Sequence, residues 1–180
     1  PDGVAALPKL GFFPGSTIGN FAPAAAVDLL RSMAATLGTG AMLLIGLDRV
    51  KDERILIPAY DDAAGVTADF NLNLLRRINR ELGGTIPVED FAHSARWVDG
   101  ASRIEMHLLA RRDLVFKVAG LRFTMRAGET IHTENSHKYG ARDARLLLRA
   151  AGWEPVAEWG DPDGLFEMLL AEAMPPALAP

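Results

Sequence analysis

The sequence predicts an α/β fold in which a parallel strand-helix-strand unit precedes a region of antiparallel strands. Two apolar stretches of strand length, residues 10–13 and 41–47, enclose a segment with helical spacing over residues 22–37. The pattern changes from residue 91 on, and at residues 104–108 apolar residues alternate with polar ones, which is typical of antiparallel strands with one covered face. With 180 residues, 49% of them hydrophobic, the chain can bury one substantial core and a second small one.

The first part of the chain is expected to form half of a doubly wound sheet. Pro14 breaks the first strand, the helix over residues 22–37 ends at Gly38, and the continuous apolar run 41–47 indicates a second buried parallel strand. The first strand has the character of a central strand, and no βα unit precedes it. We therefore expect a fragment in which residues 1–57 form the C-terminal half of a core domain.

The second part of the chain is expected to form a separate domain over residues 58–174. A long helix begins near Thr67 and ends at Gly83, and it bridges the two parts. The later predicted elements are strands at 104–108, 114–118, 121–125 and 130–136, a helix at 142–151, and strands at 153–159 and 165–171. We expect the last strands to rejoin the core sheet and residues 175–180 to form a frayed tail.

Composition and charge limit the class of partner and the compartment. The net charge is -4 and the basic residues are scattered, so we expect no nucleic-acid partner. No apolar run approaches the ~18 residues that a membrane span needs, so no membrane partner is expected. The chain has no cysteine, which excludes a disulfide framework and fits a reducing compartment. We therefore expect a cytoplasmic protein.

The stretch FFPGSTIGNF, residues 12–21, has the pattern of a buried strand that runs into a turn. In open α/β sheets, ligands bind at this strand-to-helix junction. Gly15 and Gly19 would expose the backbone, and the Asn20 amide offers both a donor and an acceptor. An ordinary turn with Asn20 as a helix cap is the alternative.

In the stretch IHTENSHKY, Glu134 and Ser136 lie two residues apart on a predicted strand, so their side chains share a face. A carboxylate beside a hydroxyl can hydrogen-bond both nitrogens of an imidazole. A solvent-facing strand is the alternative. His132 and Glu134, with His107 or His137, would also supply the two-histidine, one-carboxylate set of a non-haem iron site.

A third polar group precedes the long helix. Tyr60, Asp61, Asp62 and Thr67 gather hydroxyls, and the helix N-terminus favours negative charge, so the carboxylate of an amino acid would fit there. Alternatively, Thr67 caps the helix and the two aspartates form a turn. The sequence has no phosphate-binding glycine loop and no nucleophile elbow.

Four blocks, FFPGSTIGNF, AYDDAAGVTADFNLNLLRRINREL, RIEMHL and TENSHKY, together resemble the ergothioneine-pathway L-histidine Nα-methyltransferases. This family trimethylates the α-amino group of histidine to a betaine, hercynine, with S-adenosylmethionine as co-substrate. The resemblance covers residue 11 to about residue 170. It implies the C-terminal part of a Rossmann-like methyltransferase sheet plus an α+β substrate-binding domain with antiparallel strands.

The resemblance also implies roles for individual residues. It assigns Asn20 and Tyr60 to the α-amino and carboxylate groups of the substrate, and Glu134 and Ser136 to its imidazole. Apart from the resemblance, the chemistry needs an acceptor for the amine proton, and our hypothesis is that Tyr60 or a bound water accepts it. The other implied site residues are Gly15 and Thr67 in the substrate pocket, Met106 in its wall, and Gly15 and Ser16 on the cofactor side.

Other functions stay open at this level. The family's cofactor site is largely built from an earlier glycine-rich loop, which this chain lacks, so a non-catalytic amino-acid-binding fragment is one alternative and the iron oxygenase with His132 and Glu134 is another. Asn135 stands where family members are expected to have a small apolar residue, so another amino acid could replace histidine as substrate. Self-association through the truncated sheet edge is expected.

Overall fold

The computed structural model describes residues 7–175, and these form two compact units, each described by itself. The first unit comprises the described residues up to Lys51 and those from Ser136 on, and the second unit is Asp52–Asn135. This division differs from the expected segments 1–57 and 58–174, because the chain returns to the first unit after residue 135. Of the tail expected at residues 175–180, residues 176–180 lie outside the described part.

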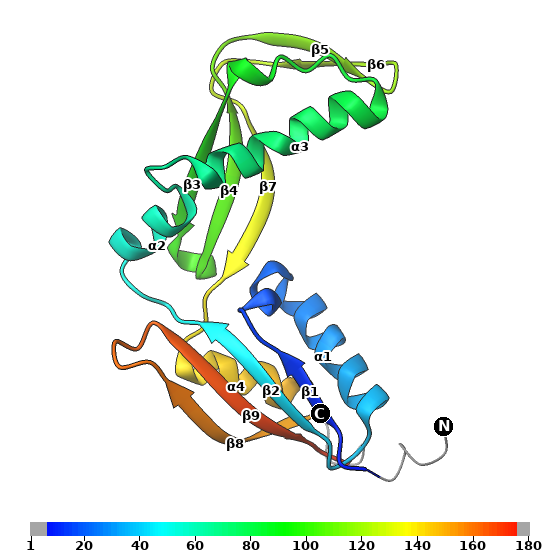
Figure 1. Cartoon of the computed structure of the whole chain (residues 1–180), viewed down its shortest axis with the longest axis vertical. Helices are drawn as coiled ribbons and strands as arrows, with labels where there is room; N and C mark the ends of the chain where they lie inside the picture. The colour runs from blue at the N-terminus through cyan, green and yellow to red at the C-terminus, as the bar shows by residue number, and fades with distance from the viewer. Residues whose placement is uncertain (1–6, 176–180) are drawn as a thin grey trace. The chain divides into compact units, whose positions relative to one another are not determined.

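The first unit is built on a four-stranded sheet with the order β1-β2-β9-β8 (Figure 1). β1 and β2 are parallel, as the sequence predicts, and β9 pairs antiparallel with both β2 and β8. The last two strands therefore lie in the same sheet as the first two. The strands are β1 (Leu10–Phe13), β2 (Met42–Asp48), β8 (Trp153–Gly160) and β9 (Phe166–Ala173).

Two helices, α1 (Pro23–Leu37) and α4 (Ala141–Ala150), pack side by side in this unit. The Arg31 guanidinium of α1 donates to the Ala150 carbonyl at 2.8 Å. Trp153 is fully buried in the core, and its indole N–H donates to the Leu30 carbonyl at 2.9 Å, so no polar atom of this ring is left unpaired. The core extends to Leu43, Ile45 and Leu47, which alternate along β2.

β1 is an edge strand of this sheet in the part of the chain that the structure describes. Leu10 and Phe12 on β1 are exposed, by 58% and 64%. An unpaired edge with exposed apolar residues is a site at which strands associate. Self-association through this edge stays a prediction.

The second unit combines helices with antiparallel strands (Figure 1). A three-stranded sheet has the order β3-β4-β7, and β5 and β6 form a separate hairpin. α3 packs on β3, β4 and β5 around a core that contains Leu75, Phe91 and Leu108. The elements are α2 (Glu53–Tyr60), α3 (Val66–Leu82), β3 (Phe91–Val98), β4 (Arg103–Ala110), β5 (Leu114–Val118), β6 (Leu121–Met125) and β7 (Thr130–His137).

Two elements of this unit were not predicted. α2 contains Pro58, which reads as a helix breaker, but the helix is short and the Asp52 carboxylate caps it by accepting from the Arg54 N–H at 2.8 Å. β3 lacks alternation, yet it pairs with β4 along its whole length. Among the described helices, none is long and apolar enough to cross a membrane.

Candidate functional site

The loop after β1 has an unusual backbone. Gly15 and Ser16 both have positive φ, 72° and 54°, and a short 3-10 helix, Thr17–Asn20, follows them. Positive φ is costly for a residue with a side chain, and such strain often lies at functional sites. A side chain added at Gly15 would meet only the Thr17 hydroxyl, 4.0 Å away, so the space beside this glycine is open. The loop therefore fits one wall of a cofactor site at the carboxyl end of β1.

The Ser16 side chain is held by the neighbouring strand. Its hydroxyl accepts a hydrogen bond from the Asp48 N–H at 2.9 Å, so Ser16 does not cap the 3-10 helix that it precedes. Asp48 is the last residue of β2. This bond fixes the strained loop to the carboxyl end of β2.

Gly19 is required by packing inside the protein, whereas the sequence pattern suggested that it admits a ligand. A Cβ atom at Gly19 would lie 2.7 Å from the His137 carbonyl oxygen. The His137 ring also donates from Nδ1 to the Gly19 carbonyl at 2.9 Å. Asn20, the next residue, is exposed at the end of the 3-10 helix.

The Asp48 carboxylate forms ion pairs with two lysines that were not among the predicted site residues. Its Oδ2 lies 2.6 Å from the Lys138 ammonium, and its Oδ1 pairs with Lys51. Lys138 also donates to the Ser136 hydroxyl at 2.9 Å. We call Ser16, Asp48, Lys51, Ser136 and Lys138 the Asp48 network. It links two predicted site residues to Asp48: Ser16 through the Asp48 backbone N–H, and Ser136 through the Lys138 ammonium.

In the second unit, Tyr60 and Thr67 flank the turn between α2 and α3, and both are half-buried. Asp62 caps α3, because its Oδ1 accepts from the Thr67 N–H at 2.8 Å and its Oδ2 from the Val66 N–H at 3.0 Å. These hydrogen bonds lower the pKa of Asp62 to about 2, and the bond from the Thr67 N–H is the largest cause. The cap predicted for Thr67 is therefore supplied by Asp62.

The end of α2 is fixed by two polar side chains. The Tyr60 carbonyl accepts from His93 Nε2 at 2.7 Å, and His93 Nδ1 accepts from the Asn71 amide at 2.9 Å. Asn71 is 1% exposed and belongs to α3. This chain of bonds holds α2 against α3 and so places Tyr60 relative to Thr67.

The other predicted residues of this unit lie on neighbouring strands. Met106 on β4 is 5% exposed, as its place in an alternating strand predicts, and its carbonyl accepts from the Thr133 hydroxyl on β7 at 3.0 Å. Glu134, the next residue on β7, is half-buried. Ser136, two residues further on, already belongs to the first unit and is 6% exposed.

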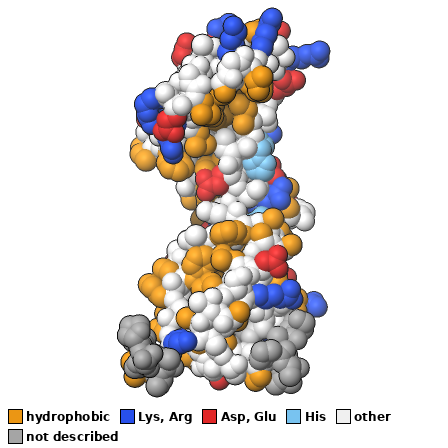
Figure 2. Space-filling view, turned by 90° about the vertical axis from the view of Figure 1, so that its right-hand side faces the viewer, with side chains coloured by type: hydrophobic (Ala, Val, Ile, Leu, Met, Phe, Trp, Pro, Cys, Tyr) orange, Lys and Arg blue, Asp and Glu red, His pale blue; other side chains and the backbone are white. Residues whose placement is uncertain are grey.

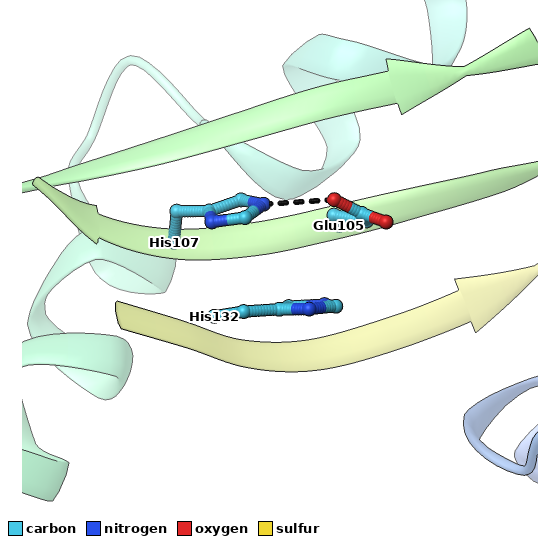
Figure 3. A group of neighbouring side chains, drawn as sticks. All are labelled: Glu105, His107 and His132. Atoms are coloured by element: carbon cyan, nitrogen blue, oxygen red, sulfur yellow. Dashed lines mark hydrogen bonds and ion pairs between the residues drawn. The ribbon is translucent and has the colours of Figure 1, made fainter. Parts of the chain in front are cut away.

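A cluster of two histidines and a carboxylate also lies on β4 and β7 (Figure 3). We call Glu105, His107 and His132 the histidine cluster. The two rings are stacked with centroids 4.7 Å apart, and His107 Nε2 donates to Glu105 at 2.9 Å. Arg103 forms an ion pair with the same carboxylate. The pKa of Glu105 is lowered, mainly by the hydrogen bond from Arg103 and further by the hydrogen bond from His107.

This arrangement differs from the predicted iron site. The carboxylate beside the histidines is Glu105, whereas Glu134 interacts with His132 through its backbone carbonyl, at 3.1 Å from Nε2. Coordination needs nitrogen lone pairs that converge on one ion, yet the rings lie parallel and their Nε2 atoms both donate hydrogen bonds. The cluster as folded is a hydrogen-bonded surface of the sheet.

The second unit also contains an apolar cavity of about 620 Å³. Side chains of α3, β5 and β6 line it, among them Leu74, Ile78, Phe116 and Phe123. Figure 2 shows hydrophobic side chains gathered on the surface in the upper part of that view. The described lining includes none of the predicted site residues, and no charged group in it is offered to a polar substrate, because Arg77 pairs with Glu81.

The predicted site residues are thus divided between the two units. Ser16 and Ser136 are linked to Asp48 in the first unit, where Gly15 and Asn20 lie on the same loop as Ser16, while Tyr60, Thr67, Met106 and Glu134 lie in the second. Sequence reasoning missed Asp48 and Lys138. Both had a signal: Asp48 ends a buried strand, and Lys138 continues the two-residue spacing of Glu134 and Ser136.

The chain is similar in sequence to known proteins. The family described as "Histidine-specific methyltransferase, SAM-dependent" matches residues 2–173. Over 165 residues the chain is 44% identical to the histidine N-alpha-methyltransferase of Mycolicibacterium smegmatis and 42% identical to that of Mycobacterium tuberculosis. Each alignment covers 91% of this chain and 51% of the relative, so the chain spans about half the length of the curated relatives it matches.

Solved structures align over most of the chain at low sequence identity. An S-adenosylmethionine-dependent methyltransferase from Clostridium acetobutylicum aligns with a TM-score of 0.49 and 10% identity, over 96% of this chain and 63% of that one. The α/β fold, with a parallel pair of strands and antiparallel strands after it, is confirmed in the described units. The family match extends over nearly the whole chain, and the chain belongs to the histidine-specific, S-adenosylmethionine-dependent methyltransferase family.

Proposed function

We propose that the protein containing this chain transfers methyl groups from S-adenosylmethionine to the α-amino group of L-histidine, up to the trimethylated betaine. The observation that carries the proposal is the pair Glu134 and Ser136, two residues apart on β7, in a chain of a histidine-specific family. The names of the two mycobacterial relatives support the same substrate.

In this proposal, Glu134 and Ser136 bind the two ring nitrogens of histidine. A neutral imidazole has one N–H donor and one acceptor nitrogen, which a carboxylate and a hydroxyl complement. Met106, buried on β4, would form the apolar wall. The α-amino and carboxylate groups would be bound by Asn20 and Tyr60, with Gly15 and Thr67 beside them.

S-adenosylmethionine supplies an activated methyl group, so the protein mainly has to position a neutral amine in line with it. Gly15 and Ser16 would line one side of the cofactor site, where the space beside Gly15 is open. The amine proton has to be accepted, and Tyr60 is our candidate for this role. A Tyr60→Phe variant with full activity would remove it.

The test is a methyl-transfer assay on the complete protein with each common amino acid, read by mass spectrometry. We expect histidine to be methylated at its α-amino group in preference to the others. Glu134→Ala should lower kcat/KM for histidine by about tenfold or more, because it removes a hydrogen bond from a charged group. Glu172→Ala, at an exposed position of β9, is the matched control.

Three outcomes would change the proposal. Preference for another amino acid would overturn the substrate, and equal effects of Glu134→Ala and Glu172→Ala would overturn the role of Glu134. Histidine binding without turnover would support a non-catalytic amino-acid-binding protein instead.

A further inference from the structure

His137 is a buried histidine that the proposed mechanism does not use. It is 7% exposed, it is the last residue of β7, and it belongs to the first unit together with the loop after β1. Its Nδ1 atom lies 2.9 Å from the Gly19 carbonyl oxygen. A carbonyl only accepts hydrogen bonds, so the hydrogen is on Nδ1. The ring therefore directs a donor at one backbone group of the loop.

The Gly19 carbonyl needs a donor from outside its own helix. It lies in the last turn of the 3-10 helix Thr17–Asn20, and the last carbonyls of a helix have no partner within that helix. The chain does not continue as a helix, because Phe21 is extended, and Pro23, where α1 begins, has no N–H to donate. The buried ring of His137 supplies the bond instead.

This carbonyl belongs to the peptide group that leads into Asn20. A peptide group is planar, so a bond that fixes the Gly19 oxygen also fixes the direction in which the chain enters Asn20. Backbone packing adds a second restraint. A Cβ atom at Gly19 would lie 2.7 Å from the His137 carbonyl oxygen and 3.2 Å from the His137 nitrogen, so the two backbones are in direct contact. Two contacts from one residue therefore hold the peptide group before Asn20.

The other end of the loop is held by a different group. The Ser16 hydroxyl accepts from the Asp48 N–H at 2.9 Å, which fixes the strained pair Gly15 and Ser16 to the end of β2. These two residues are on the proposed cofactor side, whereas Asn20 is on the amino-acid side. Loss of the His137 bond should therefore disturb binding of the amino acid more than binding of the cofactor.

We propose that His137 is a positioning residue for Asn20: its ring and its backbone fix the Gly19–Asn20 peptide group and so direct the Asn20 amide at the polar groups of the amino-acid substrate. The inference rests on the proposed function, in which Asn20 binds the α-amino or carboxylate group, and deepens it. His137 acts through Asn20 and does not touch the reacting atoms.

The experiment compares His137→Leu with His137→Asn in the complete protein. Leucine removes the donor, whereas the asparagine amide nitrogen is the same number of bonds from the backbone as Nδ1 and keeps an N–H there. Trp153→Phe is the matched control, because it removes another buried N–H of the first unit that donates to a backbone carbonyl, that of Leu30 on α1. Steady-state kinetics with histidine and with S-adenosylmethionine, plus thermal melts, give the readouts.

We expect His137→Leu to raise the KM for histidine by about fivefold, as for one lost hydrogen bond, with less than about a twofold change in kcat and in the KM for S-adenosylmethionine. His137→Asn should keep the histidine KM within about twofold of wild type. Trp153→Phe should lower the melting temperature and leave both KM values within about twofold. In an Asn20→Ala background, His137→Leu should not raise the histidine KM further, because the two residues act as one unit.

An unchanged histidine KM in His137→Leu, no recovery in His137→Asn, or an equal rise in Trp153→Phe would overturn the proposal. Additive effects of His137→Leu and Asn20→Ala would overturn it as well. If His137→Leu does not fold, His137→Gln takes its place, because its amide nitrogen is one bond further from the backbone; a histidine KM equal to that of His137→Asn would then contradict the proposal. Failure of the proposed function itself is distinct, because wild type would then not methylate histidine.

Discussion

The Asp48 network and the histidine cluster each surround one carboxylate with positively charged or polar side chains. They differ in the solvent exposure of the cation that pairs with the carboxylate. The two carboxylate side chains are similarly sheltered, 18% exposed for Asp48 and 15% for Glu105. The Lys138 ammonium, however, is 0% exposed, whereas the Arg103 guanidinium is 29% exposed. The two sites therefore differ in the exposure of the cation that would remain if the carboxylate were removed.

This comparison teaches which ion pair stabilises its unit. A buried ammonium that loses its counter-ion has no water to replace it, and removal of one partner of such a pair is strongly destabilising. A partly exposed guanidinium is solvated after the same loss, so the pair contributes little. Two similar ion pairs are thus expected to contribute differently to the stability of their units, because one cation is buried and the other is not.

The largest expected effect tests this point directly. Asp48→Asn keeps the side-chain shape but removes the carboxylate charge that pairs with the buried Lys138, and should lower the free energy of unfolding by about 3 kcal/mol. Glu105→Gln should cost no more than about 1 kcal/mol. Urea unfolding followed by tryptophan fluorescence and circular dichroism measures both. Equal losses in the two variants would show that burial of the cation is not what distinguishes the sites.

A second prediction concerns the loop that the Asp48 network holds. Gly19→Ala should cost about 1–3 kcal/mol, because the new Cβ would overlap the His137 backbone and the loop would have to shift. Gly100→Ala is the control: that glycine in the second unit has open space around it, so a change within about 0.5 kcal/mol is expected. The same unfolding experiments apply, and a neutral Gly19→Ala would mean that the contact is looser than described.

A third prediction uses Tyr139, whose N–H donates to the Asp48 carbonyl at 2.9 Å. Burial raises the pKa of Tyr139 from its usual 10.0 to about 12. The raised pKa favours the neutral phenol in the folded state, so its contribution to stability is complete below pH 10 and is lost as the pH rises through 12. Ultraviolet titration should show a late tyrosine that Tyr139→Phe removes. Ionisation of Tyr139 near pH 10 in the folded protein would contradict the buried environment.

The smallest effect is expected at the exposed start of α3, where partners are backbone amides rather than ions. The pKa of Asp62 is lowered from its usual 3.8 to about 2, so the cap should be present above pH 3.8 and be lost as the pH falls through 2. Carbon-13 detected titration of the carboxyl group measures this pKa. Amide exchange at Val66 and Thr67 should increase over the same range and should already be fast in Asp62→Ala.

Many helices and strands could be predicted, because the spacing of apolar residues within each segment indicates its secondary structure. The parallel pair β1 and β2, the helices α1 and α3, and the strands after residue 103 all have clear periodicity. β3 could not be predicted, because its residues are held by pairing with β4 and do not alternate. The return of the last strands to the first sheet was expected and is observed, but the residue at which the chain leaves the second unit depends on contacts between distant parts of the chain.

Site residues that belong to a sequence motif could be predicted, and those whose importance depends on burial could not. Glu134 and Ser136 share a strand face by spacing alone. Lys138 is fully buried and pairs with Asp48, which lies 90 positions earlier in the chain, and the spacing that includes Lys138 reveals neither its burial nor this pairing. Conversely, the pairing of His132 with Glu134 looked plausible from spacing, but the fold places Glu105 beside the rings.

The measurement that tests the central claim most directly is calorimetric titration of the complete protein with L-histidine in the presence of S-adenosylhomocysteine. Wild type and Glu134→Gln are compared under identical conditions. We predict saturable binding of histidine by wild type, and binding about tenfold weaker or worse by the variant, because the amide cannot replace the charged acceptor. Equal affinity of the two proteins, or no binding of histidine by wild type, would contradict the account.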